Sequence, residues 1–315
     1  MNIFITGSNG FIGKRLSEVA LKENFQCTLS MRNHSGDSLN NDNLSYVYRT
    51  IASNTDWSGA FSSIDCVIHT AALVHQMNGA DNNHYQDINT YGTLNLAQQA
   101  AGSGVKRFIF ISTIKVNGEH TAADLPFKPN DSYVPCDPYG LSKYEAEVGL
   151  RKIAKDTGIE VVIIRPPLVY GPGVKGNFAS MMRWLSKALP LPLGAIHNKR
   201  SLVALDNLVD LIVTCVNHPN AANETFLVSD DEDVSTSELL SKLGEALGGS
   251  SRLLPIPEAL LEFFAKLLGK HAVAQRLLGS LQVDITKTKE QLNWAPPFSV
   301  DESLKKTAQY YLEHQ

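Results

Sequence analysis

The hydrophobic pattern along the chain alternates between short apolar runs and longer segments with apolar residues at helical spacing. Few polar positions interrupt the short runs, which is typical of parallel strands covered by helices on both faces. The alternation therefore predicts a Rossmann-like α/β fold, a doubly wound parallel sheet. The strand-like runs are 2–6, 26–31, 44–51, 65–71, 107–113, 160–166 and 224–229, and the helical segments are 11–24, 90–104, 139–158 and 207–218.

After Pro166 the pattern becomes irregular, because prolines and glycines interrupt both kinds of spacing. We expect this change to mark a second domain. The larger domain would comprise residues 1–170 and 200–230, and a smaller α/β domain would comprise residues 171–199 and 231–315.

The final third of the chain carries two helix signals. Ser235 followed by Glu238 matches a capping box, which starts a helix. Residues 257–268 are strongly apolar, with charged residues spaced four apart along one side. Because of these charges, we expect this helix to pack into the small domain or a dimer contact rather than lie on a membrane.

Composition and charge narrow the class of protein. The 315 residues are 43% hydrophobic and 19% charged, as in an ordinary globular protein, and the net charge of −4 favours neither nucleic acid nor an anionic membrane as partner. The start runs directly into a strand without a basic leader, and no apolar run is long enough to span a membrane, so we expect a cytoplasmic protein without membrane insertion. The cysteines and histidines lack ligand spacing, which predicts neither a metal site nor a disulfide framework.

A glycine-rich turn lies between the first strand and the first helix. Gly7, Gly10 and Gly13 allow backbone N–H groups and the helix N-terminus to approach a pyrophosphate, and Phe11 and Ile12 begin the helix. At this place in a strand–turn–helix unit, the motif predicts a dinucleotide coenzyme.

The end of the second strand bears on the choice of coenzyme. NAD-binding folds commonly carry an acidic residue there, which hydrogen-bonds the ribose. Arg32 follows the second strand here and offers a cation suited to a 2′-phosphate. The coenzyme is therefore expected to be NAD or NADP, with NADP favoured by Arg32.

Tyr139 and Lys143 are the strongest sign of chemistry. Their spacing of four places both side chains on one face of a helix, one turn apart. A phenol with an ordinary pKa near ~10 is a poor base at neutral pH. A lysine ammonium and an oxidised nicotinamide can both stabilise the phenolate, so the pair suits removal of a proton from an alcohol as hydride leaves its carbon.

Two further polar residues accompany this pair. Thr113 ends the strand 107–113 at the carboxyl edge of the sheet, where its hydroxyl can hydrogen-bond the alcohol oxygen whose proton Tyr139 removes. Asn89 opens the next expected helix, and it either caps that helix or orients the lysine.

Together these features resemble the extended short-chain dehydrogenase/reductases, in their NAD-dependent epimerase/dehydratase family. Within that family the chain looks close to the UDP-galactose 4-epimerase group of nucleotide-sugar enzymes, over nearly its whole length. The motifs that carry the resemblance are the glycine loop, residues 65–72 (Asp-Cys-Val-Ile-His-Thr-Ala-Ala), Asn89, Ser112-Thr113, Tyr139-x-x-x-Lys143 and residues 165–173 (Arg-Pro-Pro-Leu-Val-Tyr-Gly-Pro-Gly).

The resemblance implies a role for each matching residue. Thr113, Tyr139 and Lys143 would form the catalytic set, with Asn89 beside the lysine, and the smaller domain would bind the nucleotide sugar. The coenzyme would contact the glycine loop, Arg32, Ala71, Ala72, Ser112, Tyr139, Lys143 and Pro166. The substrate would contact Thr113, Asn177, Leu193 (near the nucleobase), Arg200 (at the diphosphate) and Asp284 (near the ribose).

The reaction implied is C4 chemistry on a UDP-hexose or UDP-N-acetylhexosamine. Related 4,6-dehydratases carry an acidic pair after the catalytic threonine, whereas Ile114 and Lys115 follow Thr113 here, which disfavours dehydration. We place a 4-epimerase first, which oxidises C4 and returns hydride to the other face. An NADPH-dependent 4-ketoreductase is the alternative, and Arg32 favours it.

Two residues depart from the pattern of the epimerase group, and one class of protein without catalysis is a further alternative. Leu168 replaces an asparagine and Asn117 replaces a tyrosine that the epimerase group usually has, which affects the expected sugar pocket. A coenzyme-binding sensor without catalysis is the distant alternative, although such proteins typically lose the tyrosine or the lysine. Relatives commonly form homodimers through the helices that begin near Asn89 and Tyr139, so a homodimer is also an expectation.

Overall fold

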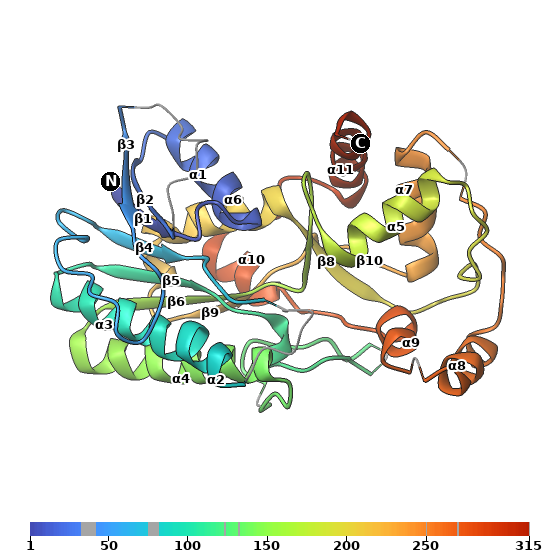
Figure 1. Cartoon of the computed structure of the whole chain (residues 1–315), viewed down its shortest axis with the longest axis horizontal. Coiled ribbons are helices and arrows are strands. Elements are labelled where there is room, and N and C mark those ends of the chain that lie inside the picture. The colour runs from blue at the N-terminus through green and yellow to red at the C-terminus, as the bar shows by residue number, and fades with distance from the viewer. Residues whose placement is uncertain are drawn as a thin grey trace.

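The computed structural model describes residues 1–32, 42–74, 82–122, 124–131, 133–249, 251–269 and 271–314. Within these ranges, seven parallel strands form the large sheet, in the order β3-β2-β1-β4-β5-β6-β9 (Figure 1). This order places the first strand inside the sheet, between β2 and β4, as doubly wound dinucleotide-binding folds do. The strands are β1 (Asn2–Thr6), β2 (Gln26–Met31), β3 (Leu44–Tyr48), β4 (Cys66–His69), β5 (Arg107–Ile111), β6 (Glu160–Arg165) and β9 (Thr225–Leu227).

Helices cover both faces of this sheet, which explains the continuous hydrophobicity of its strands. Ile3 and Ile5 of β1 pack with α1 and α6, whereas Phe4 between them packs with α3 and α4 on the other face. The doubly wound α/β prediction is therefore confirmed. The covering helices are α1 (Phe11–Lys22), α6 (Leu205–Asn217), α3 (Thr93–Gly102) and α4 (Pro138–Thr157).

The expected strand and helix bounds differ from the observed ones mainly at their ends. β1 and β2 have the expected bounds, and the other strands stop one to three residues earlier at their carboxyl ends. The apolar runs continue beyond the paired residues because the chain leaving the sheet is still buried, as at Pro166. The helix expected over 90–104 is preceded by the short helix α2 (Asn82–Tyr85) and a π-helical segment, η1 (Gln86–Gly92).

A small sheet forms the second half of the molecule, with the order β10-β8-β7. Two segments expected in the larger domain, β7 (Leu168–Tyr170) and β8 (Arg200–Ala204), instead pair with each other here, and β10 (Asp233–Val234) joins β8. The consecutive prolines 166 and 167 separate β6 from β7, since neither can donate a ladder hydrogen bond. The helices around this sheet are α5 (Gly176–Ser186), α7 (Thr236–Ala246) and α11 (Val300–Glu313).

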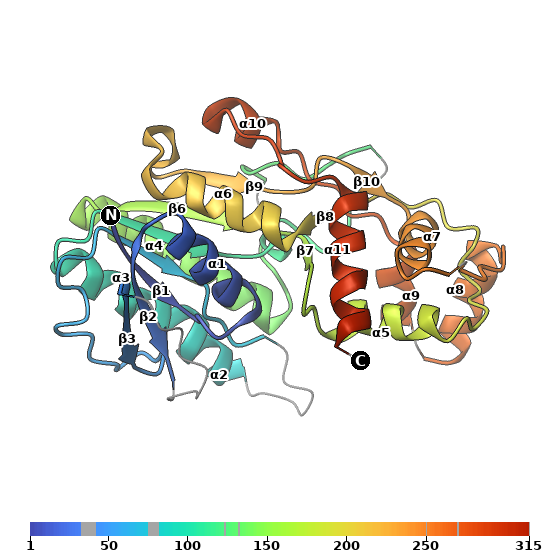
Figure 2. The ribbon, with the colours of Figure 1, turned by 90° about the horizontal axis from the view of Figure 1, so that it is seen from above.

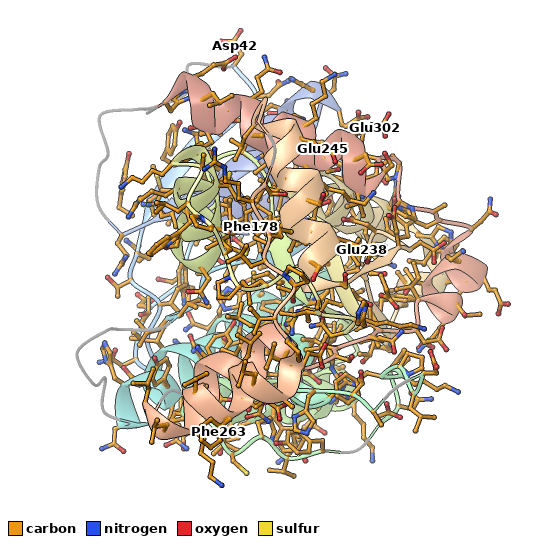
Figure 3. All side chains as sticks on the ribbon, turned by 90° about the vertical axis from the view of Figure 1, so that its right-hand side faces the viewer. Asp42, Phe178, Glu238, Glu245, Phe263 and Glu302 are labelled. Carbon is orange, nitrogen blue, oxygen red and sulfur yellow. The ribbon has the colours of Figure 1, made fainter. Side chains whose placement is uncertain are left out.

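The predicted capping box is confirmed at the start of α7, where Ser235 and Glu238 exchange hydrogen bonds. Figure 3 shows Glu238 near one end of this helix and Glu245 near the other. The remaining helices are α8 (Glu258–Leu267), α9 (His271–Leu278) and α10 (Thr286–Leu292).

The apolar helix α8 lies at the end of the molecule farthest from β3, as Figures 1 and 2 both show. Leu261 and Ala265 pack on α9, so the helix does join the small half, as expected. However, none of its ten residues is buried, and its opposite side exposes large apolar residues, among them Phe263 (Figure 3). Among the described residues, no helix is long and apolar enough to cross a membrane.

Candidate functional site

The glycine loop after β1 has the close approach that its sequence predicts. Gly7 has a φ of +68°, and a Cβ atom there would lie 2.8 Å from the backbone of Ala71. A Cβ atom on Gly13 would lie 2.1 Å from the carbonyl oxygen of Gly7, so the tight turn excludes any side chain at both positions. No side chain caps α1, whose N-terminal N–H groups therefore remain available for an anion.

Buried hydrogen bonds hold the carboxyl ends of β1 and β4 together beside this loop. The His69 ring lies between the hydroxyl groups of Thr6 (2.7 Å) and Thr93 (2.9 Å). Burial and the nearby Lys143 charge lower the pKa of His69 to about 3, so this ring stays neutral. Because the strand end is fixed in this way, the following Ala71 and Ala72 lie half-buried at the sheet edge.

Tyr139 and Lys143 lie in the first two turns of α4. Asp137 caps this helix by accepting a hydrogen bond from the N–H of Gly140 (3.1 Å), and Pro138 occupies its first position. Lys143 is buried, and its ammonium donates to the carbonyl of Ile111 (2.8 Å) at the end of β5. The helix and the strand end are therefore joined by the lysine itself.

The environment of the pair shifts both pKa values in the direction of the neutral forms. Burial lowers the pKa of Lys143 to about 7, although the carboxylate of Glu147 opposes that change. Burial also raises the pKa of Tyr139 above its ordinary value, and the charge of Asp137 and the Tyr85 phenol add to this effect. A phenolate at Tyr139 therefore requires additional positive charge close by, which an oxidised nicotinamide would supply.

Thr113 lies two residues beyond β5 in extended conformation and begins a short 3₁₀ segment, η2 (Ile114–Val116). Lys115 in this segment forms an ion pair with Asp137 (3.0 Å), the cap of the helix that carries Tyr139. The N–H of Ile114 donates to the carbonyl of Pro166 (3.0 Å), which follows β6. These contacts bring Thr113, Tyr139 and Pro166 to one edge of the sheet.

The role expected for Asn89 as the first residue of a helix is wrong. Asn89 lies within η1, and its amide exchanges hydrogen bonds with the backbone of Leu73 (2.8 and 3.0 Å) and donates to Ser142 (3.1 Å). A π-helical turn carries an extra residue, and such turns are frequent at functional sites. Here it directs Asn89 at the helix bearing Lys143 and at the segment that follows Ala72.

Ser112 is buried and belongs to a charged network that the motifs did not reveal. Its hydroxyl donates to Glu147 (2.6 Å), which also accepts two hydrogen bonds from Arg165 (2.6 and 2.9 Å). Glu147 follows Lys143 by four residues, so the signal was present as a third polar residue on the same helix face. It was missed because a glutamate at that spacing is usually exposed to solvent.

Arg32 follows β2 and is exposed. It lies at the carboxyl end of β2, which neighbours β1 and is two strands away from β4. The contact of Arg32 with a 2′-phosphate stays a prediction.

The four residues expected to hold the nucleotide lie on separate elements of the small half. Asn177 is exposed in the first turn of α5, and Leu193 packs between two apolar clusters. Arg200 begins β8, and its guanidinium donates to the carbonyls of Arg276 (2.9 Å) and Gly279 (2.8 Å) at the end of α9.

Asp284 precedes α10 and accepts a hydrogen bond from the N–H of Thr286 (2.8 Å). The side chain of Thr286, together with this N–H, lowers the pKa of Asp284. Residue 281 bridges to Arg200, and residue 283 bridges to Phe127, so Asp284 and Arg200 lie on adjoining segments. In the described residues, no group of three or more His, Cys, Asp or Glu side chains could hold a metal ion.

A family model matches most of the chain. The model describes the NAD dependent epimerase/dehydratase family, and it covers residues 3–229. This range contains the glycine loop, Thr113, Tyr139 and Lys143.

Curated proteins are similar over almost the full length. A Vibrio cholerae protein named UDP-glucose 4-epimerase is 50% identical over 99% of this chain and 96% of its own. An Escherichia coli O157:H7 protein named N-acetyl-alpha-D-glucosaminyl-diphospho-ditrans,octacis-undecaprenol 4-epimerase is 26% identical over 99% of this chain and 96% of its own.

Solved structures share the fold. A UDP-glucuronic acid 4-epimerase from Bacillus cereus in complex with NAD has a TM-score of 0.80 at 22% identity, covering 100% of this chain and 99% of that one. A UDP-glucose 4-epimerase from Thermotoga maritima with UDP-glucose has a TM-score of 0.79 at 24% identity, with the same coverage.

Proposed function

Because the chain belongs to the NAD-dependent epimerase/dehydratase family, we propose that it is a 4-epimerase of a UDP-hexose or UDP-N-acetylhexosamine. The observation that carries this proposal is the arrangement of Thr113, Tyr139 and Lys143 beside the glycine loop, at one edge of the sheet. The Vibrio cholerae protein named UDP-glucose 4-epimerase, which is 50% identical to this chain, supports the proposal.

The proposed chemistry is a reversible oxidation at C4 of the sugar. Thr113 holds the C4 hydroxyl, and the Tyr139 phenolate takes its proton as the C4 hydride leaves. A nicotinamide coenzyme held beside Tyr139 and Lys143 would supply the hydride acceptor and donor for this step. Lys143 stabilises the phenolate by its charge, and Tyr139 gives the proton back when hydride reaches the opposite face of the 4-keto sugar.

We propose NAD as the coenzyme. The family description names NAD, and relatives of the same fold are described in complex with NAD. The NADP preference drawn from Arg32 has no support among these relatives. Mass spectrometry of the coenzyme released from the denatured protein tests this assignment. Release of NADP would support the preference that the sequence analysis drew from Arg32.

The proposed nucleotide contacts are Asn177, Leu193, Arg200 and Asp284. One guanidinium nitrogen of Arg200 donates to the α9 carbonyls, and burial lowers the pKa of the guanidinium. A diphosphate bound to its other nitrogens would supply a compensating negative charge. An Arg200→Met variant is expected to raise KM for the nucleotide sugar more than it lowers kcat. An unchanged KM would place the diphosphate elsewhere.

A homodimer is part of the proposal. α3 and α4 pack side by side on one face of the sheet, and Tyr91 beside α3 and Val148 on α4 are about half exposed. A second copy could cover both. Light scattering coupled to size-exclusion chromatography measures the molar mass and decides between monomer and dimer.

The deciding experiment is proton NMR of the purified protein with UDP-N-acetylglucosamine and, separately, UDP-glucose, without added coenzyme. Inversion at C4 is the expected result and requires retained coenzyme. If no inversion occurs but NADPH is consumed with a UDP-4-keto sugar, the enzyme is a 4-ketoreductase, as Arg32 would suggest. Binding of coenzyme without any turnover would indicate a sensor.

A further inference from the structure

A buried glutamate on the catalytic helix connects all the elements that carry the proposed catalytic residues. The Glu147 side chain is fully buried, and both of its oxygens are occupied. One oxygen accepts hydrogen bonds from Ser112 (2.6 Å) and Arg165 (2.9 Å). The other accepts from Arg165 (2.6 Å) and Arg151 (2.9 Å).

These partners lie on different parts of the fold. Ser112 follows β5 and directly precedes Thr113, whereas Arg165 ends β6 and directly precedes Pro166. The same arginine donates to Asn117 (2.9 Å) and to the carbonyl of Pro129 (3.1 Å), in the loop between Thr113 and α4. Glu147 is therefore the point at which α4, two strand ends and this loop meet.

Glu147 also lies on the same helix face as the reactive pair. Tyr139, Lys143 and Glu147 follow each other at intervals of four, so the carboxylate lies one turn beyond the ammonium. Burial opposes ionisation of Glu147, but the hydrogen bonds and charges of Arg165, Ser112 and Arg151 lower its pKa, and it stays a carboxylate. Its charge acts on Lys143 in the opposite sense to burial and favours the ammonium.

We infer that Glu147 is a positioning residue, which sets Thr113 against α4 through Ser112 and supports the charge of Lys143. The inference rests on the proposed function, because it concerns the same site. Glu147 contacts none of the reacting atoms itself, so its effect would be exerted through Ser112 and Lys143.

A second ion pair on the same two strands provides a matched control. Arg107 begins β5 and bonds Glu160 (2.6 and 2.8 Å), which begins β6, at the opposite edge of the sheet. Arg107 is as buried as Arg165, but its other partners are the carbonyls of Cys215 and His218, far from the coenzyme edge. A purely structural ion pair would behave as this one does.

The test uses variants that remove the charged pair together, because a single removal leaves one buried charge and can prevent folding. Glu147→Gln/Arg165→Met retains an acceptor for Ser112 but removes the charge. Glu147→Leu/Arg165→Met removes both. The control variant is Glu160→Gln/Arg107→Met, which likewise removes both charges of its ion pair, and near-UV circular dichroism confirms the fold of each variant.

The first double variant is expected to move the acid limb of the kcat profile to higher pH by about half to one pH unit, because a weaker ammonium stabilises the Tyr139 phenolate less. The charged groups around this site in the described residues include Lys143, Glu147, Arg151, Arg165, Asp137 and its ion-pair partner Lys115, with His69 neutral.

The second double variant is expected to show the same shift and, in addition, a kcat lower by about 10–100-fold at nearly unchanged KM, because Thr113 is displaced. The control variant Glu160→Gln/Arg107→Met is expected to keep both kcat and the pH profile. If the folded double variants retain the wild-type kcat and pH profile, Glu147 is structural only and the inference fails.

A second readout separates this inference from the proposed function. The ionisation of Tyr139 can be followed by titrating the protein with pH in the presence of NAD and measuring phenolate absorbance. Subtracting the same titration of a Tyr139→Phe variant leaves the signal of Tyr139. The inference predicts a higher titration midpoint in both double variants than in the wild type. This result stands even if the wild type turns over no nucleotide sugar, and an unchanged midpoint overturns the inference.

Discussion

Helices α4 and α8 differ in which of their residues the fold covers. α4 buries polar side chains, with Ser142, Lys143 and Glu147 all about 1% exposed or less. α8 exposes apolar ones, and Phe263 and Leu267 are 62% and 71% exposed. The comparison teaches that burial on one helix depends on what the rest of the chain places against it, and not on the polarity of its own residues.

The buried polar groups of α4 are retained because each has a partner. An unpaired charge in that position would cost several kcal/mol. Lys143 instead donates to the Ile111 carbonyl, and its ammonium lies 4.3 Å from the centre of the Phe110 ring. The exposed apolar side chains of α8 forgo the stabilisation that burial would give, but they leave no charge unpaired, so they destabilise the fold less.

The largest effect is expected for the phenol of α4. Tyr139→Phe should lower kcat on the order of 10²–10⁴-fold, because the base that takes the C4 proton is lost. Epimerase activity measured by NMR checks this. Coenzyme content and thermal stability should stay unchanged, and a variant with unchanged turnover would remove Tyr139 from the catalytic set.

The next effect concerns the apolar side of the same helix. Leu150→Ala should destabilise the protein by about 2–5 kcal/mol, because Leu150 is fully buried between α4 and the sheet and its loss leaves a cavity. Urea unfolding measures the free energy. A loss below about 1 kcal/mol would show that this face of α4 is less closely packed than described.

A smaller effect should appear as a pH dependence of stability. Burial lowers the pKa of Lys143 to about 7, so above this pH the folded protein releases a proton that the unfolded chain still binds. The unfolding free energy of the wild type should therefore rise relative to that of Lys143→Met, by about 2 kcal/mol between about pH 7 and pH 9. Parallel pH profiles of the two proteins would contradict the lowered pKa.

The smallest effect is expected on α8. Phe263→Ser should change the unfolding free energy by less than about 0.5 kcal/mol, since the side chain contributes little to the core. Leu150→Ala serves as the matched comparison under the same conditions. A large loss of stability, or a lower molar mass in light scattering, would show that another surface covers this side of α8 in solution.

Much of the large half could be predicted from local patterns. The apolar runs of β1 and β2 match the observed strands residue for residue, because a strand buried on both faces tolerates few polar positions. The tight turn formed by Gly7 and Gly13 could also be predicted, since only glycine fits at these two positions. Tyr139 and Lys143 were found because their spacing is a property of one helix.

Other features depended on contacts between distant segments. β7 and β8 are short, and they pair with each other across about thirty residues of sequence, with β10 on the other side of β8. The π-helical turn at Asn89 depends on contacts with the segment after β4 and with α4.

The sequence by itself therefore determined the doubly wound sheet, the glycine turn and the catalytic spacing, because each of these arises from periodicity within one segment. Only the tertiary structure decided that Glu147 is buried against Ser112 and Arg165 and that α8 presents an apolar side outward. The physical reason is that burial of a side chain depends on which distant elements pack against it, and the residue's own neighbours in sequence do not specify them.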